Sequence, residues 1–258
     1  MGKLIKYNLK CYYKEILILL SLIVLSNLGL FYKINKWPRE IIFGLSIMIL
    51  SFACLVVLIW NINMFSKDLY SDTSYLIFTL PVKGRSILGA KLITSIIQVI
   101  LVNIVAGIFI YINFKNSSLA HQDIVAYLTF KNISIASIIA MFHYISFLLT
   151  IYVSVALSRV AIRKKKLGKL GSFGIFVGIC IIVGKLSMWI TKIFPQTIKL
   201  AINPNTIISG TVDGAKFSLN FVNVNIASTI FDIVFAVILF IVVSYLLQEK
   251  LKFNMFLY

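Results

Sequence analysis

The sequence holds few side chains that could do acid–base, nucleophilic or metal chemistry. Its 258 residues include two histidines and eight acidic residues, which form neither an HExxH helix nor the Glu-Glu plus distant His arrangement of a membrane protease. The three cysteines, Cys11, Cys54 and Cys180, are far apart and lack the spacing of metal ligands. We therefore predict that the chain is not an enzyme and holds no metal ion.

One segment approaches the pattern of a nucleotide-binding P-loop. Gly84 and Gly89 have the spacing of the motif's glycines, but the lysine, Lys91, stands one position late. Leu92 replaces the Ser or Thr that would hold Mg²⁺, and the segment leads into an apolar run without a buried strand before it. We expect no cofactor on this chain; if ATP drives it, a separate ATPase subunit binds ATP and Mg²⁺.

Three ionisable residues, His143, Lys185 and Asp232, fall inside apolar runs, where charge is costly and therefore marks candidate pathway residues. At about 1.5 Å per residue, Lys185 and Asp232 each lie about 9 Å from the outer end of their runs, which favours an ion pair. In the alternative, Lys185 reaches the surface alone and Asp232 is protonated or faces a wet cavity. For His143, a bond to a neighbouring helix is favoured over substrate contact. Hydrogen bonding between helices is also predicted for Asn61, Asn63, Gln98 and Asn103.

These side chains are positioned by long apolar runs. The chain is 60% hydrophobic and 13% charged, whereas about a quarter of a soluble domain is charged. A membrane-spanning helix needs about 20 apolar residues. Six runs reach that length, and we predict a single all-α membrane domain with spans at residues 15–32, 40–62, 91–112, 133–157, 171–191 and 226–247.

The first 14 residues predict an amphipathic helix in the membrane interface. One side carries Lys3, Lys6, Lys10 and Lys14, and the other carries Leu4, Ile5, Leu9 and Tyr12. A signal peptide is disfavoured, because the first apolar run ends without a small-residue cleavage site.

Lysines and arginines predict the orientation of the spans. Sixteen of the 25 lie in the N-terminal helix, in residues 65–91, in residues 159–169 and in the tail, and eight lie on the other side. By the positive-inside rule, both termini face the cytosol. The basic cluster at residues 163–166 is interpreted as a topology signal, with binding of anionic lipid as the alternative.

Residues 65–91, between the second and third runs, carry six charges and Pro81, so we expect them to lie in water. Ser71 and Asp72 can cap a helix over residues 73–80, which Pro81 ends. The exposed apolar surface of this short helix indicates that a partner docks there.

Residues 68–92 resemble the loop between the second and third helices of ABC-2 type exporter permeases. In that family a short coupling helix ends in a Thr-Leu-Pro-Val-like turn, followed by a basic residue and a lysine, matched here by Thr79, Leu80, Pro81, Val82, Arg85 and Lys91. Lys83 departs from the Ser or Thr common in the family. The resemblance implies that contact with the ATPase involves Asp68, Asp72, Tyr75, Leu76, Phe78, Thr79, Leu80, Pro81 and Arg85.

The resemblance, closest to small six-span bacterial permeases for antimicrobial or toxin-like peptides, implies a bacterial cell-membrane exporter. Its partners would be two cytosolic ABC ATPases, a second permease copy or paralogue, and membrane lipids, without nucleic acid. An amphipathic peptide ranks first as substrate and a lipid-like antibiotic second; a non-transporting immunity or sensor subunit is the alternative of another class. The family also implies outer re-entrant helices within residues 192–225, best at 195–208. Aromatic pathway candidates in spans two and five are Phe52, Trp60, Phe173 and Phe176, with packing as the alternative.

Overall fold

The computed structural model describes residues 2–34, 36–70, 83–116, 130–161, 168–201, 208–212, 215–219 and 221–250. Within them, six helices are long and apolar enough to cross a membrane, as the sequence predicts. They are α1 (Gly2–Tyr32), α2 (Arg39–Tyr70), α4 (Gly84–Asn116), α6 (Phe130–Ala161), α7 (Gly168–Ile193) and α8 (Ile226–Tyr245), and α8 continues into the π-helical turn η2 (Leu246–Lys250).

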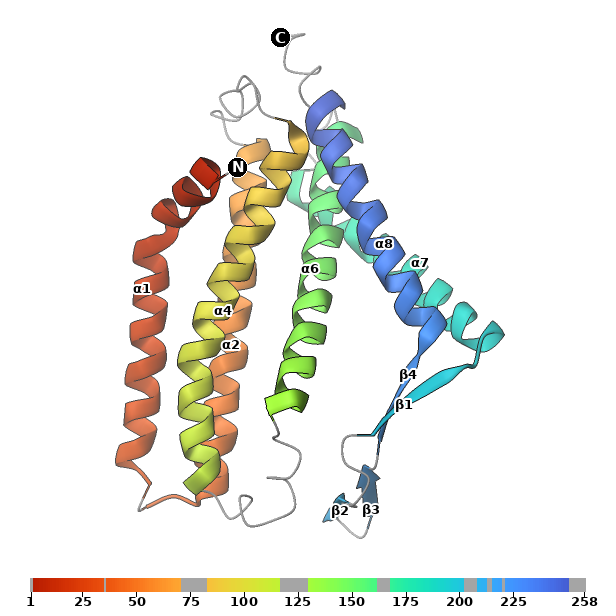
Figure 1. Ribbon diagram of the computed structural model, residues 1–258. Helices are drawn as coiled ribbons and strands as arrows, with labels where there is room; N and C mark the ends of the chain where they lie inside the picture. Colours follow the sequence, from red (N-terminus) through yellow and green to blue (C-terminus); the bar gives the residue numbers. More distant parts are fainter. Residues whose placement is uncertain are drawn as a thin grey trace.

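The helices run alternately up and down the bundle (Figure 1). α1 begins and α2 ends at one end, which we call the basic end because the exposed lysines of the first turns of α1 lie there. α1, α2, α4 and α6 lie side by side, whereas α8 diverges from them toward the opposite end. This arrangement is that of a multi-pass membrane protein.

α1 is one continuous helix, and its first turns bend away from the axis of the rest (Figure 1). Lys3, Lys6, Lys10 and Lys14 are exposed, whereas the apolar residues predicted to lie opposite them are half-buried. The two predicted faces therefore differ in exposure. The location of this segment in the membrane interface stays a prediction.

Most helices extend beyond the predicted apolar runs, because a helix satisfies its own backbone hydrogen bonds and can continue into polar residues. The largest difference concerns residues 65–91, which we expected to lie in water. Residues up to Tyr70 belong to α2, and α4 starts at Gly84. Lys91 is 2% exposed inside the bundle, so its predicted place in water is wrong. Residues 71–82, with the predicted coupling helix, lie outside the described residues.

The segment between α7 and α8 contains strands. β1 (Thr197–Ala201) pairs antiparallel with β4 (Phe221–Asn225), and β2 (Ile208–Val212) pairs antiparallel with β3 (Ala215–Leu219). The re-entrant helices predicted at residues 195–208 are therefore wrong wherever this segment is described. The missed signal was the alternation of polar and apolar residues in β1 and β4, which has the period of two typical of strands.

Two clusters of buried apolar side chains hold the bundle together. One lies where α1, α2 and α4 meet and includes Ile23, Val57 and Val102. The other joins α2, α4, α6 and α8 toward the basic end, where the rings of Phe65 and Tyr152 stack with centroids 4.1 Å apart. The last turn of α2 and the first turns of α4, which flank residues 71–82, therefore both belong to this packed core.

Candidate functional site

Buried polar pairs join α2 to α4 along almost their whole length. Each pair lies at a different level: Asp68 with Lys91 in an ion pair, Asn61 with Gln98 at 2.9 Å, and Ser46 with Asn113 at 2.6 Å. All three pairs keep one antiparallel register, because the number of residues between successive partners on α2 equals the number between their partners on α4. Sliding or rotating one helix would break all three pairs, so together they fix the register of α2 against α4.

The ion pair lies nearest to the basic end. Lys91 also donates a hydrogen bond to the backbone carbonyl of Met64, at 3.2 Å, so its ammonium has two oxygen partners in α2. A buried charge is tolerated only when it is paired and hydrogen-bonded. The pair therefore fixes the last turns of α2 against α4, immediately before residues 71–82.

Gly84 fixes the other end of that segment. A Cβ atom added to this glycine would lie 2.5 Å from the carbonyl oxygen of Ser244 in α8. Only a residue without a side chain lets the first turn of α4 approach α8 so closely. The start of α4 is therefore packed directly against α8.

Of the predicted ATPase-coupling residues, Asp68 and Arg85 belong to the described part of the chain. Arg85 is exposed in the first turn of α4, and Asp68 lies in the last turn but one of α2. The others lie outside the described residues: Asp72, Tyr75, Leu76, Phe78, Thr79, Leu80 and Pro81. Their role stays a prediction.

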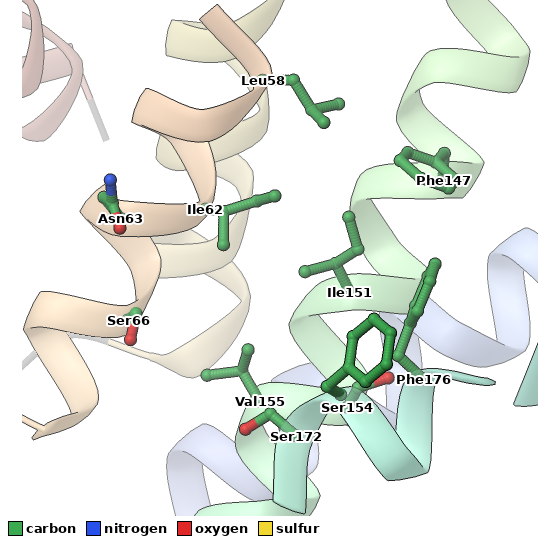
Figure 2. Close-up of a pocket in the computed structure, with 11 residues that line it drawn as sticks. Leu58, Ile62, Asn63, Ser66, Phe147, Ile151, Ser154, Val155, Ser172 and Phe176 are labelled. Carbon is green, nitrogen blue, oxygen red and sulfur yellow. The ribbon is translucent and has the colours of Figure 1, made fainter. Parts of the chain in front are cut away.

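A cavity of about 340 Å³ lies between α2, α6 and α7 near the basic end. Figure 2 shows Leu58 and Phe147 at one end of this cavity and Ser66, Val155 and Ser172 at the other. Its lining residues are Leu58, Ile62, Asn63, Ser66, Phe147, Ile151, Ser154, Val155, Ser172, Phe173 and Phe176. We call it the lateral cavity. It shares Leu58 and Phe147 with a larger hollow of about 1040 Å³ between α2, α4 and α6.

The structure brings two of the four aromatic pathway candidates to the lateral cavity. Phe173 and Phe176 line it, and the Phe176 ring meets that of Phe147 edge to face at 5.7 Å. Phe52 is exposed on α2, and Trp60 packs partly against the core cluster of α1, α2 and α4. These two line neither of the two hollows.

The charged residues inside the spans are arranged differently from the prediction. Among the described residues, Lys185 and Asp232 form no ion pair. α7 meets α8 through the hydroxyls of Ser187 and Ser228, 3.1 Å apart. Lys185, two residues before Ser187, is rotated about 200° from that contact and is exposed on the other side of α7.

Asn61 and Gln98 act as predicted, because they bond to each other across α2 and α4. Asn103 donates to the carbonyl of Val99 within its own helix, at 2.8 Å. The α2–α4 pairing was missed as a whole. The spacing of Ser46, Asn61 and Asp68 in one run is repeated in reverse order by Lys91, Gln98 and Asn113 in the next, and that match could have revealed it.

No group of three His, Cys, Asp or Glu side chains that could hold a metal ion occurs in the described part of the chain. Gly84 is the first residue of α4, so the P-loop-like glycines belong to a helix rather than to a phosphate-binding loop. No family model matches the sequence, and neither the characterised proteins nor the solved structures compared with it include a match.

Proposed function

We propose that this chain is the permease subunit of an ATP-driven exporter of the ABC-2 type. It pairs with a second permease and with two cytosolic ATPases, which bind ATP and Mg²⁺. The substrate crosses between the paired permeases, and an amphipathic peptide ranks first. The basic end faces the cytosol of a bacterial cell.

The observation that supports the proposal best is that the helix ends on both sides of residues 71–82 are fixed by close contacts. The ion pair of Asp68 with Lys91 fixes one flank, and the contact of Gly84 with Ser244 fixes the other. A partner that moves a segment held at both flanks moves the helices behind it. An immunity or sensor subunit without transport would not need such a transmission.

The distribution of charge supports the orientation. The exposed lysines of α1 and the exposed Arg85 and Arg159 lie at the basic end, and an excess of basic residues marks the cytosolic side of a membrane protein. An ATPase in the cytosol would reach residues 71–82 from that side.

The test uses affinity-tagged full-length chain purified from its own cells in mild detergent. We expect an ATPase with nucleotide-binding motifs to co-purify. Replacing Tyr75 and Phe78 together by Ala should reduce its recovery at least about tenfold, because aromatic anchors dominate most interfaces. Tyr111→Ala, at an exposed tyrosine near the other end of α4, is the matched control and should change nothing.

Equal ATPase recovery with the double variant and with Tyr111→Ala would contradict the coupling role. Absence of any ATP hydrolysis in the purified complex would contradict transport by an ABC exporter. The same preparation then identifies the substrate, as the candidate peptide or lipid that changes the rate of hydrolysis.

A further inference from the structure

The lateral cavity changes in polarity along its length. Toward the basic end its wall carries the hydroxyls of Ser66, Ser154 and Ser172 beside Val155, and deeper in the bundle it carries only the apolar side chains of Leu58 and Phe147 (Figure 2). A membrane changes in the same direction, from head groups to hydrocarbon. A molecule that fits both ends must therefore have a polar head and an apolar chain.

The cavity opens at the surface of the bundle. Phe147 and Phe173, which line it, are 42% and 65% exposed. In a membrane-spanning bundle this surface meets lipid, so an occupant can enter sideways from the leaflet at the basic end. The volume of the lateral cavity, about 340 Å³, lies within the range of about 300–1,000 Å³ typical of small-ligand sites.

A basic side chain lies next to the polar end. The guanidinium of Arg159 lies over the ring of Tyr70, 5.4 Å from its centroid. The Tyr70 hydroxyl is 3.3 Å from the carbonyl of Val155 and 3.5 Å from the hydroxyl of Ser172, and both of these residues line the cavity. Arg159 follows Val155 by one helical turn, so it lies over the same wall.

A guanidinium stacked on a ring keeps the N–H groups at its edge available for a phosphate. We propose that the lateral cavity binds one anionic phospholipid from the leaflet at the basic end. Its phosphate lies beside Arg159 at the polar end, and one acyl chain follows Leu58 and Phe147 toward the larger hollow between α2, α4 and α6.

A peptide fits the deep part of this cavity less well than an acyl chain. Peptide N–H and C=O groups need hydrogen-bond partners when they enter an apolar environment, whereas Leu58, Ile151 and Phe176 offer none. The site lies within one subunit, apart from the path proposed between two permeases. The inference rests on the membrane location of the bundle and does not depend on an ATPase partner.

The test reconstitutes the full chain, without ATPase, in phosphatidylcholine vesicles. A trace of phosphatidylglycerol carries a photoreactive group midway along one acyl chain, and a parallel series carries the same group on phosphatidylcholine. After irradiation, mass spectrometry locates the adducts. We expect phosphatidylglycerol adducts concentrated at Phe147, Phe176 and their neighbours, above the background at the exposed Ile138.

Two pairs of variants separate specific binding from general contact with lipid. Ile151→Phe fills the cavity and should lower the adducts to background, whereas Ile138→Phe, the same change on the exposed face of α6, should not. Arg159→Gln should reduce phosphatidylglycerol adducts about fivefold and leave phosphatidylcholine adducts unchanged. Lys192→Gln, at an exposed lysine of the opposite end, is its control, and Arg159→Lys should restore part of the labelling.

Excess unlabelled phosphatidylglycerol should also displace the label from the unaltered chain, which tests the site even if Ile151→Phe does not fold. Adducts at the cavity no stronger than at Ile138, or equally strong with Ile151→Phe, would overturn the proposal. Equal labelling by both lipids regardless of Arg159 would overturn it too, as would crosslinks between two chains at the cavity in place of lipid adducts. None of these outcomes bears on ATPase coupling.

Discussion

Lys91 of α4 forms an ion pair with Asp68 of α2 although the lysine is almost completely buried in the bundle. This contact closes the α2–α4 unit just before the segment proposed to meet the ATPase. Its two partners differ in environment, since the side chain of Asp68 is 27% exposed. Removing one partner should therefore not have the same effect as removing the other.

Asp68→Asn should lower the free energy of unfolding by about 3 kcal/mol, because it leaves the buried Lys91 ammonium without a negatively charged partner. Lys91→Met should cost less, since Asp68 can reach water. The double variant should recover most of the loss. Unfolding in mixed detergent micelles measures all three, with exposed Lys67→Met as control. A double variant as unstable as the sum of the singles would contradict a stabilising pair.

Gly84→Ala should destabilise the bundle by about 1–3 kcal/mol, because the new methyl group would overlap the Ser244 carbonyl and push α4 from α8. Gly44→Ala is the matched control: no heavy atom lies within 4 Å of its added Cβ. That change should be neutral or stabilise the helix by up to about 1 kcal/mol. Thermal unfolding compares the two variants, and equal midpoints would argue against the close approach.

Asn61→Ala should destabilise the protein by about 1 kcal/mol, because it removes the hydrogen bond to Gln98 at the middle of the α2–α4 unit. Asn103→Ala should cost less, because the Asn103 amide donates within its own helix. Adding Gln98→Ala to Asn61→Ala should cost less than the two single effects together, since both remove the same bond. A fully additive double variant would show that the bond contributes nothing.

Asp232→Asn and Lys185→Met should act independently on stability, with the effects adding to within about 0.5 kcal/mol, because the two residues do not share a partner. Equilibrium unfolding of the two single variants and the double variant measures this. Strong coupling between the two substitutions would contradict the structure and support the ion pair expected from the matching depths.

Single cysteines at Lys6 and at Lys36 should react with a membrane-impermeant maleimide from opposite sides, in a chain whose three cysteines have been replaced. Both positions are exposed, one near the start of α1 and one in the turn before α2. The excess of basic residues at the basic end places Lys6 on the cytosolic side. Labelling of both from the same side would overturn the proposed topology.

Apolar run length alone was enough to count the helices. A run of about 20 apolar residues without charge is stable across a bilayer only as a helix, because every backbone group must find its partner inside the segment. This requirement is local, so it can be read from each run separately. The period-two alternation of polar and apolar residues in β1 and β4 is equally local, and it is typical of strands.

Which side chains meet was decided by packing. The depths of Lys185 and Asp232 match along the chain, yet the rotation of α7 about the Ser187–Ser228 contact turns the lysine away. Lys91 ends a charged segment of the sequence, yet in the bundle it is buried opposite Asp68. Depth follows from the number of residues, whereas the direction of a side chain depends on how each helix is rotated against its neighbours, and only the assembled bundle determines that rotation.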